Sequence, residues 1–356
     1  MTALLTAPAA AATTHPQPPA RLGPNWFTTV MGTGIVAVAA TTLPLHAPAL
    51  RPVAIAVWAL AAALLVVLSA AWVAQRHRPA AADQVTAQFW GAPPMAALTV
   101  GGGALVLGLP AAVPLDAVCW LIGTAGGLAT AVAIPYRMMT GRPAAPDAAF
   151  GGWLMPVVPP MVSAANAALL APHLTGPLRL DLVLAGYALF GVSLAATVVM
   201  LPQLWSRLVH HGPGPAALAP TWWIVLGPLG QSITAAHLLG TVAATTLPAP
   251  YGPAAQAFAV LYGLPTLGFA LLWLALAAAL TLRAARHGGL PFTLAWWAFV
   301  FPVGTLVTGT AGLAARTHAT ALTALAVALY ALLATAWATA ATRTLAMALR
   351  EIRQKA

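Results

Sequence analysis

The sequence predicts an all-α polytopic membrane protein, and three observations support this prediction. Of the 356 residues, 61% are hydrophobic and only 6% are charged, whereas a soluble domain has roughly 25% charged residues. Charged or Pro/Gly-rich breaks separate ten apolar segments, each long enough to cross a hydrocarbon core of about 30 Å. All five acidic residues fall between these segments or at their ends. We therefore expect no carboxylate at the membrane centre.

The segments predict ten transmembrane helices in one domain, residues 25–346. They lie at 25–44, 52–74, 88–109, 114–140, 150–172, 179–206, 221–247, 253–282, 292–314 and 319–346. Residues 1–24 are rich in Ala, Pro and Thr and lack the apolar core of a signal peptide, so we expect a disordered N-terminal tail. Residues 347–356 are predicted to form a short C-terminal tail.

The basic residues predict how the helices are oriented. Twelve of the fifteen Lys and Arg residues lie on one side of the predicted bundle, and the other three, Arg51, Arg179 and Arg316, lie on the opposite side. By the positive-inside rule, both termini and the breaks after the second, fourth, sixth and eighth segments face the cytoplasm of a multi-pass protein in the cell inner (plasma) membrane. Because topology explains the basic excess, we expect no nucleic-acid binding.

An internal repeat marks the odd-numbered segments. An aromatic pair opens four of them, at Trp26-Phe27, Phe89-Trp90, Trp222-Trp223 and Trp296-Trp297, and Trp153 opens the fifth. A helix-disturbing residue follows in each: Gly32, Pro94, Pro159, Pro228 and Pro302. Small or hydroxylated residues come next, whereas the even segments are dominated by Ala, Leu and Val. We expect Pro159, Pro228 and Pro302 to kink their helices.

This repeat predicts five helical hairpins, with the odd helices as an inner five around a central pore and the even helices toward lipid. Irregular backbone at membrane depth is tolerated where it is buried in protein or lines a cavity. The alternative is a solid bundle whose small residues allow close helix packing. The candidate pore-lining residues are Gly32, Pro94, Ser163, Asn166, Gly227, Thr234, His237, Thr305 and Thr308. For His237, the alternatives are a hydrogen-bonded core residue and a pore residue that makes conduction pH-dependent.

Three motifs carry a resemblance to a known family. They are Asn25-Trp-Phe-Thr-Thr-Val-Met-Gly-Thr-Gly-Ile-Val36, Trp222-Trp-Ile-Val-Leu-Gly-Pro-Leu-Gly-Gln-Ser232 and Trp296-Trp-Ala-Phe-Val-Phe-Pro-Val303. Over residues 25–346 the chain resembles the tellurite-resistance/dicarboxylate transporter family, which includes malate and sulfite transporters and plant slow anion channels. The resemblance implies five hairpins around a pore, passage of anions, a homotrimer, and a gate formed by the aromatic residue of the Phe301-Pro302 step.

The residues themselves also single out Phe301. It lies about five residues beyond the first Trp of its repeat, which places it near mid-membrane at 1.5 Å per residue. The corresponding residues of the other repeats are Met31, Pro93, Val158 and Gly227, so only this repeat has an aromatic ring there. A ring among smaller neighbours can close a neutral pore sterically and by dewetting it. The alternative is that Phe301 only packs between helices and stabilises them.

The function that we predict is an anion channel or facilitator for small inorganic or organic anions. The sequence does not distinguish among chloride, nitrate, sulfite, tellurite and malate-like dicarboxylates, and a neutral, hydroxyl-lined pore offers no bidentate Arg clamp that would mark a dicarboxylate. The alternative is a proton-coupled transporter of C4-dicarboxylates or of sulfite or tellurite, for which His237 is the only obvious relay. An enzyme is not expected, because the chain lacks Gly-x-Ser-x-Gly and His-Glu-x-x-His motifs. With Cys119 as its one cysteine, we expect no metal site and no cofactor; the expected partners are a small anion, membrane lipid and two further copies of the chain.

Overall fold

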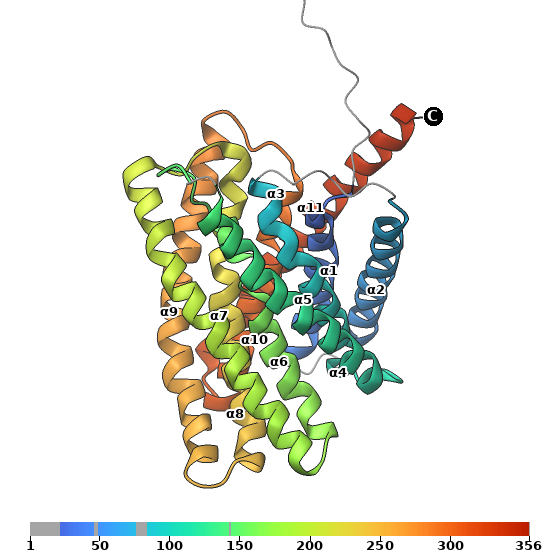
Figure 1. Ribbon diagram of the computed structural model, residues 1–356, viewed down its shortest axis with the longest axis vertical. Helices are drawn as coiled ribbons and strands as arrows, with labels where there is room; N and C mark the ends of the chain where they lie inside the picture. Colours follow the sequence, from blue (N-terminus) through green and yellow to red (C-terminus); the bar gives the residue numbers. More distant parts are fainter. Residues whose placement is uncertain (1–21, 46–48, 76–83, 142–143, 356) are drawn as a thin grey trace, which may run out of the picture.

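The computed structural model describes residues 22–45, 49–75, 84–141 and 144–355, and every regular element in these ranges is helical. Ten long helices lie roughly side by side (Figure 1). They are α1 (Phe27–Thr42), α2 (Leu50–Ala74), α4 (Ala92–Val106), α5 (Ala112–Thr140), α6 (Pro159–Leu170), α7 (Gly176–His211), α8 (Leu226–Thr246), α9 (Tyr251–Arg286), α10 (Phe301–Thr317) and α11 (Thr320–Lys355). The short α3 (Gln84–Gln88) precedes α4.

The predicted tails and breaks are only partly covered by these ranges. Most of the predicted N-terminal tail, residues 1–21, lies outside the described residues, as do Arg76, Arg78 and Arg142 of the predicted cytoplasmic breaks. At the other end, α11 continues to Lys355. The segment predicted as a C-terminal tail is therefore mostly a continuation of the last helix.

The ten helices fall into two groups by burial. Side chains of α1, α4, α6, α8 and α10 are buried along most of each helix, and in α10 every residue from Phe301 to Ala314 is buried. The other five helices bury one face and expose large apolar side chains such as Val66, Leu121 and Val199. Each buried helix packs against the exposed helix that follows it.

The exposed helices have the length and composition of membrane spans. Within the described ranges, six helical stretches are long and apolar enough to cross a membrane: α2, α5, α7, α9, α11 and residues Leu294–Thr317, which contain α10. Apolar faces of this length are stable in hydrocarbon, where every backbone group of a helix is hydrogen-bonded internally. The chain is therefore a multi-pass membrane protein.

The internal repeat of the sequence has a structural counterpart in short 3₁₀ turns. The aromatic pairs lie in or beside turns at Pro24–Trp26, Phe89–Gly91, Gly151–Leu154, Ala216–Val225 and Leu294–Phe299. An α-helix follows each turn, so the backbone changes once per hairpin from the narrower 3₁₀ form to the α-helical form. Turns of neighbouring hairpins contact one another at this end of the bundle.

The three prolines predicted to kink helices do not lie at mid-helix. Pro159 is the first residue of α6, Pro302 is the second residue of α10, and Pro228 is the third residue of α8. A proline in the first turn costs no hydrogen bond, because the first N–H groups of a helix have no partner within it. These prolines start α-helices, and prolines inside long helices occur instead in α5, α7 and α9.

Hydrogen bonds from indole groups tie exposed helices to buried ones. Trp58 of α2 donates to the carbonyl of Val100 in α4 at 2.8 Å, and Trp120 makes the same kind of bond from α5 to α6. Trp337 of α11 donates to the hydroxyl of Thr33 in α1 at 3.2 Å. This last bond joins the final helix to the first, so the bundle closes on itself.

Candidate functional site

A cavity with a volume of about 240 Å³ lies among the buried helices. All five buried helices contribute to its wall. One lining residue from each, in chain order, is Ile35, Leu98, Asn166, Gln231 and Thr308. The polar residues at this cavity lie beyond the first turn of their α-helices. We call it the wide cavity.

Five residues singled out by the sequence meet at the wide cavity. Asn166, Thr234, His237 and Thr308, predicted to line a pore, line it together with Phe301. The hydroxyls of Thr234 and Thr308 are 2.7 Å apart and connect α8 to α10. These side chains come from positions far apart in the chain, and only the packing of α6, α8 and α10 brings them together.

Four other predicted pore residues lie between helices instead. A Cβ atom on Gly32 would meet the Trp297 ring at 2.5 Å, and Pro94 packs against α5. Ser163 is fully buried, and Trp120 donates to its carbonyl. Thr305 is also fully buried, and its hydroxyl donates to the carbonyl of Pro302 at 2.7 Å. For these residues, the alternative of close helix packing describes the structure better.

A much smaller cavity, about 20 Å³ in volume, lies at the other end of the buried helices. We call it the narrow cavity. Its wall includes three methionines, Met31, Met95 and Met155, together with Val158 and Trp297. Gly227 and Pro302 also line it. Its lining residues belong to the 3₁₀ turns, to the first halves of the buried helices and to the link between Gly151–Leu154 and α6. Apart from Thr28, its described lining side chains are apolar.

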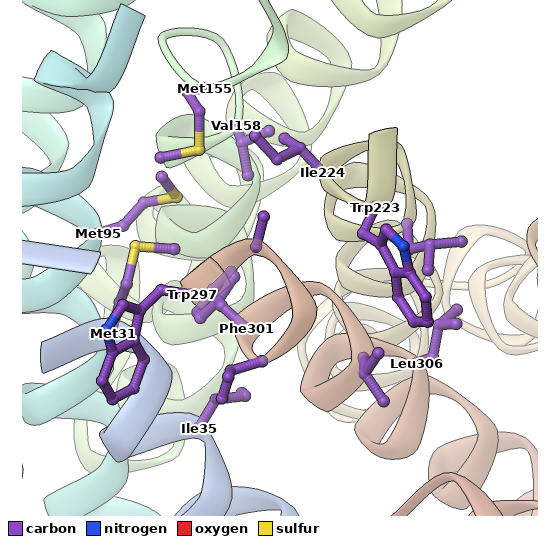
Figure 2. Packing of buried hydrophobic residues seen from close by; sticks show 14 of the residues in the cluster. Met31, Ile35, Met95, Met155, Val158, Trp223, Ile224, Trp297, Phe301 and Leu306 are labelled. Atoms are coloured by element: carbon purple, nitrogen blue, oxygen red, sulfur yellow. The ribbon is translucent and has the colours of Figure 1, made fainter. Parts of the chain in front are cut away.

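Phe301 lines both cavities. Figure 2 shows its ring among Met31, Ile35 and Trp297, with Met95 nearby. The residue is only 3% exposed, so its ring is surrounded although there is free space on two sides. Three of the residues that correspond to Phe301 in the other repeats, Met31, Val158 and Gly227, also line the narrow cavity. The repeat therefore brings equivalent positions to one level of the bundle.

An arginine lies beside the histidine of the wide cavity. Arg316, in the last turn of α10, donates from Nη2 to the Thr241 hydroxyl at 2.6 Å and from Nε to His237 Nδ1 at 3.5 Å. Because Nδ1 of His237 accepts, the proton of the neutral ring is assigned to Nε2. Among the described lining residues of the wide cavity, none carries a permanent charge. Arg316 therefore places a positive charge beside a side chain of the wall.

One acidic residue is buried, which the sequence did not predict. Asp116, five residues into α5, is fully buried, and its Oδ1 accepts a hydrogen bond from Asn166 Nδ2 at 3.1 Å. A Cβ atom on Gly101 would meet Asp116 Oδ1 at 2.5 Å, so the missing side chain of this glycine makes room for the carboxyl. The prediction that acids lie only at segment ends identified the position of Asp116 but not its burial.

Comparisons with known proteins identify a family for the chain. A family model for the voltage-dependent anion channels, SLAC1, matches residues 21–345. An uncharacterized transporter of Methanocaldococcus jannaschii is 29% identical over 291 residues, which cover 80% of this chain and 81% of that protein. A sulfite efflux pump of Trichophyton rubrum is 27% identical over 304 residues, which cover 81% of this chain and 80% of that protein. The predicted resemblance is confirmed, and the chain belongs to the SLAC1 family of voltage-dependent anion channels and related membrane transporters.

Proposed function

We propose that the protein is an anion channel or facilitator whose path runs between α1, α4, α6, α8 and α10 and is closed by Phe301. The observation that most supports this proposal is that Phe301 lines both the wide and the narrow cavity. Removing or rotating this single ring would join the two spaces. An apolar constriction of this kind stops ions by excluding water as well as by steric block.

The direction of the buried helices favours an anion over a cation. The α-helices α6, α8 and α10 start at the narrow cavity, where Val158, Gly227 and Pro302 contribute to its wall. The N-terminal end of a helix carries a partial positive charge, equivalent to about +0.5 of an elementary charge. Several such ends around one constriction stabilise an anion there without a fixed basic residue.

The substrate that we propose is a small anion, and a sulfite-like oxyanion is the candidate that the relatives favour. The Trichophyton rubrum relative is a sulfite efflux pump. The described residues of the wide cavity's wall include hydroxyl and amide groups but no arginine pair that would clamp a dicarboxylate in bidentate fashion. A wall without such a clamp suits a small inorganic anion better than a malate-like one.

The Phe301→Ala variant tests the proposed gate. In proteoliposomes it should pass anions at about ten times the wild-type rate or more, which corresponds to a barrier lower by about 1.4 kcal/mol. Phe299→Ala is the matched control: Phe299 packs edge-on against Trp223 at 5.1 Å and lines neither cavity. Unchanged flux through a folded Phe301→Ala protein would show that the ring only stabilises the bundle.

A second candidate function is coupled transport of the same anions, and buried Asp116 is the observation that favours it. Proton-coupled carriers use ionisable groups inside the membrane, and Asp116 contacts Asn166 at the wall of the wide cavity. Electrical recordings in planar bilayers separate the two functions. A channel should carry current with no proton gradient, whereas current that appears only with a proton gradient would establish the coupled carrier.

We further propose that the wide cavity faces the outside of the cell and the narrow cavity faces the cytoplasm, with both termini cytoplasmic. The twelve-to-three division of basic residues supports this orientation. A cysteine in place of exposed Arg286, in a Cys119→Ala background, should resist labelling by an impermeant reagent applied to intact cells. We also propose a homotrimer, in which some exposed apolar faces contact other copies; a mass measurement in detergent that gave only monomer would exclude it.

A further inference from the structure

We propose that the wide cavity selects oxyanions that carry a proton of their own, such as hydrogen carbonate and chemically similar monoanions, over bare anions of the same size and charge. This inference rests on the proposed passage of anions through the cavity. It follows from counting which polar atoms of the wall can donate a hydrogen bond and which can only accept one. The count is unusual for a site that handles anions, because acceptors outnumber donors.

Asn166 presents its carbonyl oxygen to the cavity. Its Nδ2 donates to the carbonyl of Leu98 at 2.8 Å and to Asp116 Oδ1 at 3.1 Å, so both N–H bonds are used. A backbone carbonyl can only accept, so the amide nitrogen must lie on the Leu98 side and the amide cannot be reversed. Because Asn166 lines the cavity, its remaining polar atom, Oδ1, is an acceptor for a substrate. Asp116 acts here as a positioning residue.

The threonine hydroxyls of the wall also present lone pairs rather than protons. Thr42 donates to the carbonyl of Ala39 at 3.0 Å, and Thr99 donates to the carbonyl of Met95 at 2.7 Å. A hydroxyl has one proton, so neither residue has a second one to offer.

The paired hydroxyls of Thr234 and Thr308 follow the same rule. They lie 2.7 Å apart, and they also reach the carbonyls of Gly230 and Thr305, each at 3.1 Å. Both of their protons can be used within the protein. All four hydroxylated residues belong to the wall of the wide cavity.

Two side chains of the described wall can donate to a bound anion. His237 offers Nε2–H, because its Nδ1 accepts from Arg316, and the amide of Gln231 can be turned to offer its N–H groups. An anion that also carries an O–H group can accept from these two residues and donate to Asn166. A bare anion would instead bring its lone pairs against those of Asn166 and of the threonines. Sites built to hydrogen-bond a hydroxyl discriminate strongly against analogues that lack it.

Hydrogen carbonate and nitrate are a matched pair of probes, since both are planar, three-oxygen monoanions and only hydrogen carbonate has an O–H group. Their permeability ratio should be measured in planar bilayers with the full chain, at neutral pH and in the Phe301→Ala background, which is expected to conduct. Nitrate gives up its water more readily, so the readout is the change in this ratio between variants. Asn166→Leu, which keeps the volume and removes the acceptor, should lower the hydrogen carbonate to nitrate ratio about three- to tenfold, the value of one hydrogen bond.

The control is Ser163→Ala, which removes a hydroxyl from the same helix at a position that does not line the cavity, and it should leave the ratio unchanged. Should Asn166→Leu not fold, Asn166→Ala makes the same test and should lower the ratio equally. A ratio unaltered by loss of the Asn166 amide would overturn the inference. If neither anion passes through the folded Phe301→Ala protein, it is the proposed channel function that fails.

Discussion

The two cavities that meet at Phe301 differ in size and in chemistry. The wide cavity, about 240 Å³ in volume, has amide, imidazole and hydroxyl groups in its wall, whereas the narrow cavity, about 20 Å³ in volume, is lined mainly by methionine, aromatic and aliphatic side chains. Both are built from the same five-fold repeat. The aromatic turns and the starts of the α-helices surround the narrow cavity, and later turns of the same helices surround the wide cavity. We infer that the narrow side determines how much anion passes and that the wide side determines which anion passes.

After Phe301→Ala, the largest effect on anion flux should come from enlarging the narrow side. Met95 is fully buried and lines the narrow cavity with Phe301. Met95→Ala would give the ring space to turn aside, and we expect anion flux in proteoliposomes to rise about fivefold, or roughly 1 kcal/mol of barrier. Truncating a buried methionine should also lower the free energy of unfolding by about 2–5 kcal/mol.

Met161→Ala separates these two consequences. Met161 is equally buried but belongs to a different apolar cluster, with residues of α7 and α8. We expect it to lower the free energy of unfolding to a similar degree without raising the flux. Equal flux increases in the two variants would mean that any loosening of the bundle opens the path, and the distinction between the two sides would be lost.

Much of this division was predictable from the sequence. Each of the ten apolar segments overlaps one of the ten main helices, and the repeat of aromatic pair and breaker marks the level of the narrow cavity. The prolines were assigned to the correct helices but to the wrong role. A proline near the start of an apolar segment fits a kink or a helix start equally well, and the 3₁₀ turns that decide between them depend on contacts between hairpins.

Helical angles explain why Thr308 lines the wide cavity and Thr305 does not. At 3.6 residues per turn, Thr308 lies about 20° from Phe301 around the axis of α10, and Thr305 lies about 40° away in the opposite sense. Because of that difference, the Thr305 side chain packs against Gly230 of α8. A Cβ atom built on Gly230 would lie 2.6 Å from Thr305 Oγ1. Burial of Asp116 depends in the same way on a long-range partner, Asn166, 50 residues away. No local pattern marks such a partner.

A smaller effect is expected at the edge of the wide cavity. Arg316 is the cation beside His237 there, and Arg316→Gln removes its charge while keeping hydrogen-bond donors for Thr241. Anion flux that starts from the wide side should fall about twofold at low salt, and the difference should disappear near 1 M salt, where the screening length is about 3 Å. Arg179→Gln is the control, because Arg179 bonds Thr245 and Thr246 at the end of α8. A twofold loss that persisted in 1 M salt would indicate a structural role for Arg316.

The smallest effect should come from the hydroxyl pair within the wide cavity. Thr234 and Thr308 can each replace their mutual bond with one to a backbone carbonyl, so removing one partner leaves the other satisfied. A double-mutant cycle with Thr234→Val and Thr308→Val should therefore give a coupling energy of about 0.6 kcal/mol, the average for such pairs in membranes. Equilibrium unfolding in mixed detergent measures this coupling, and proteoliposome flux should change less than about twofold in the same variants. If flux rose as much in Thr308→Val as in Met95→Ala, the wide side would also limit the rate, and conduction would be governed by both walls around Phe301 rather than by the narrow one.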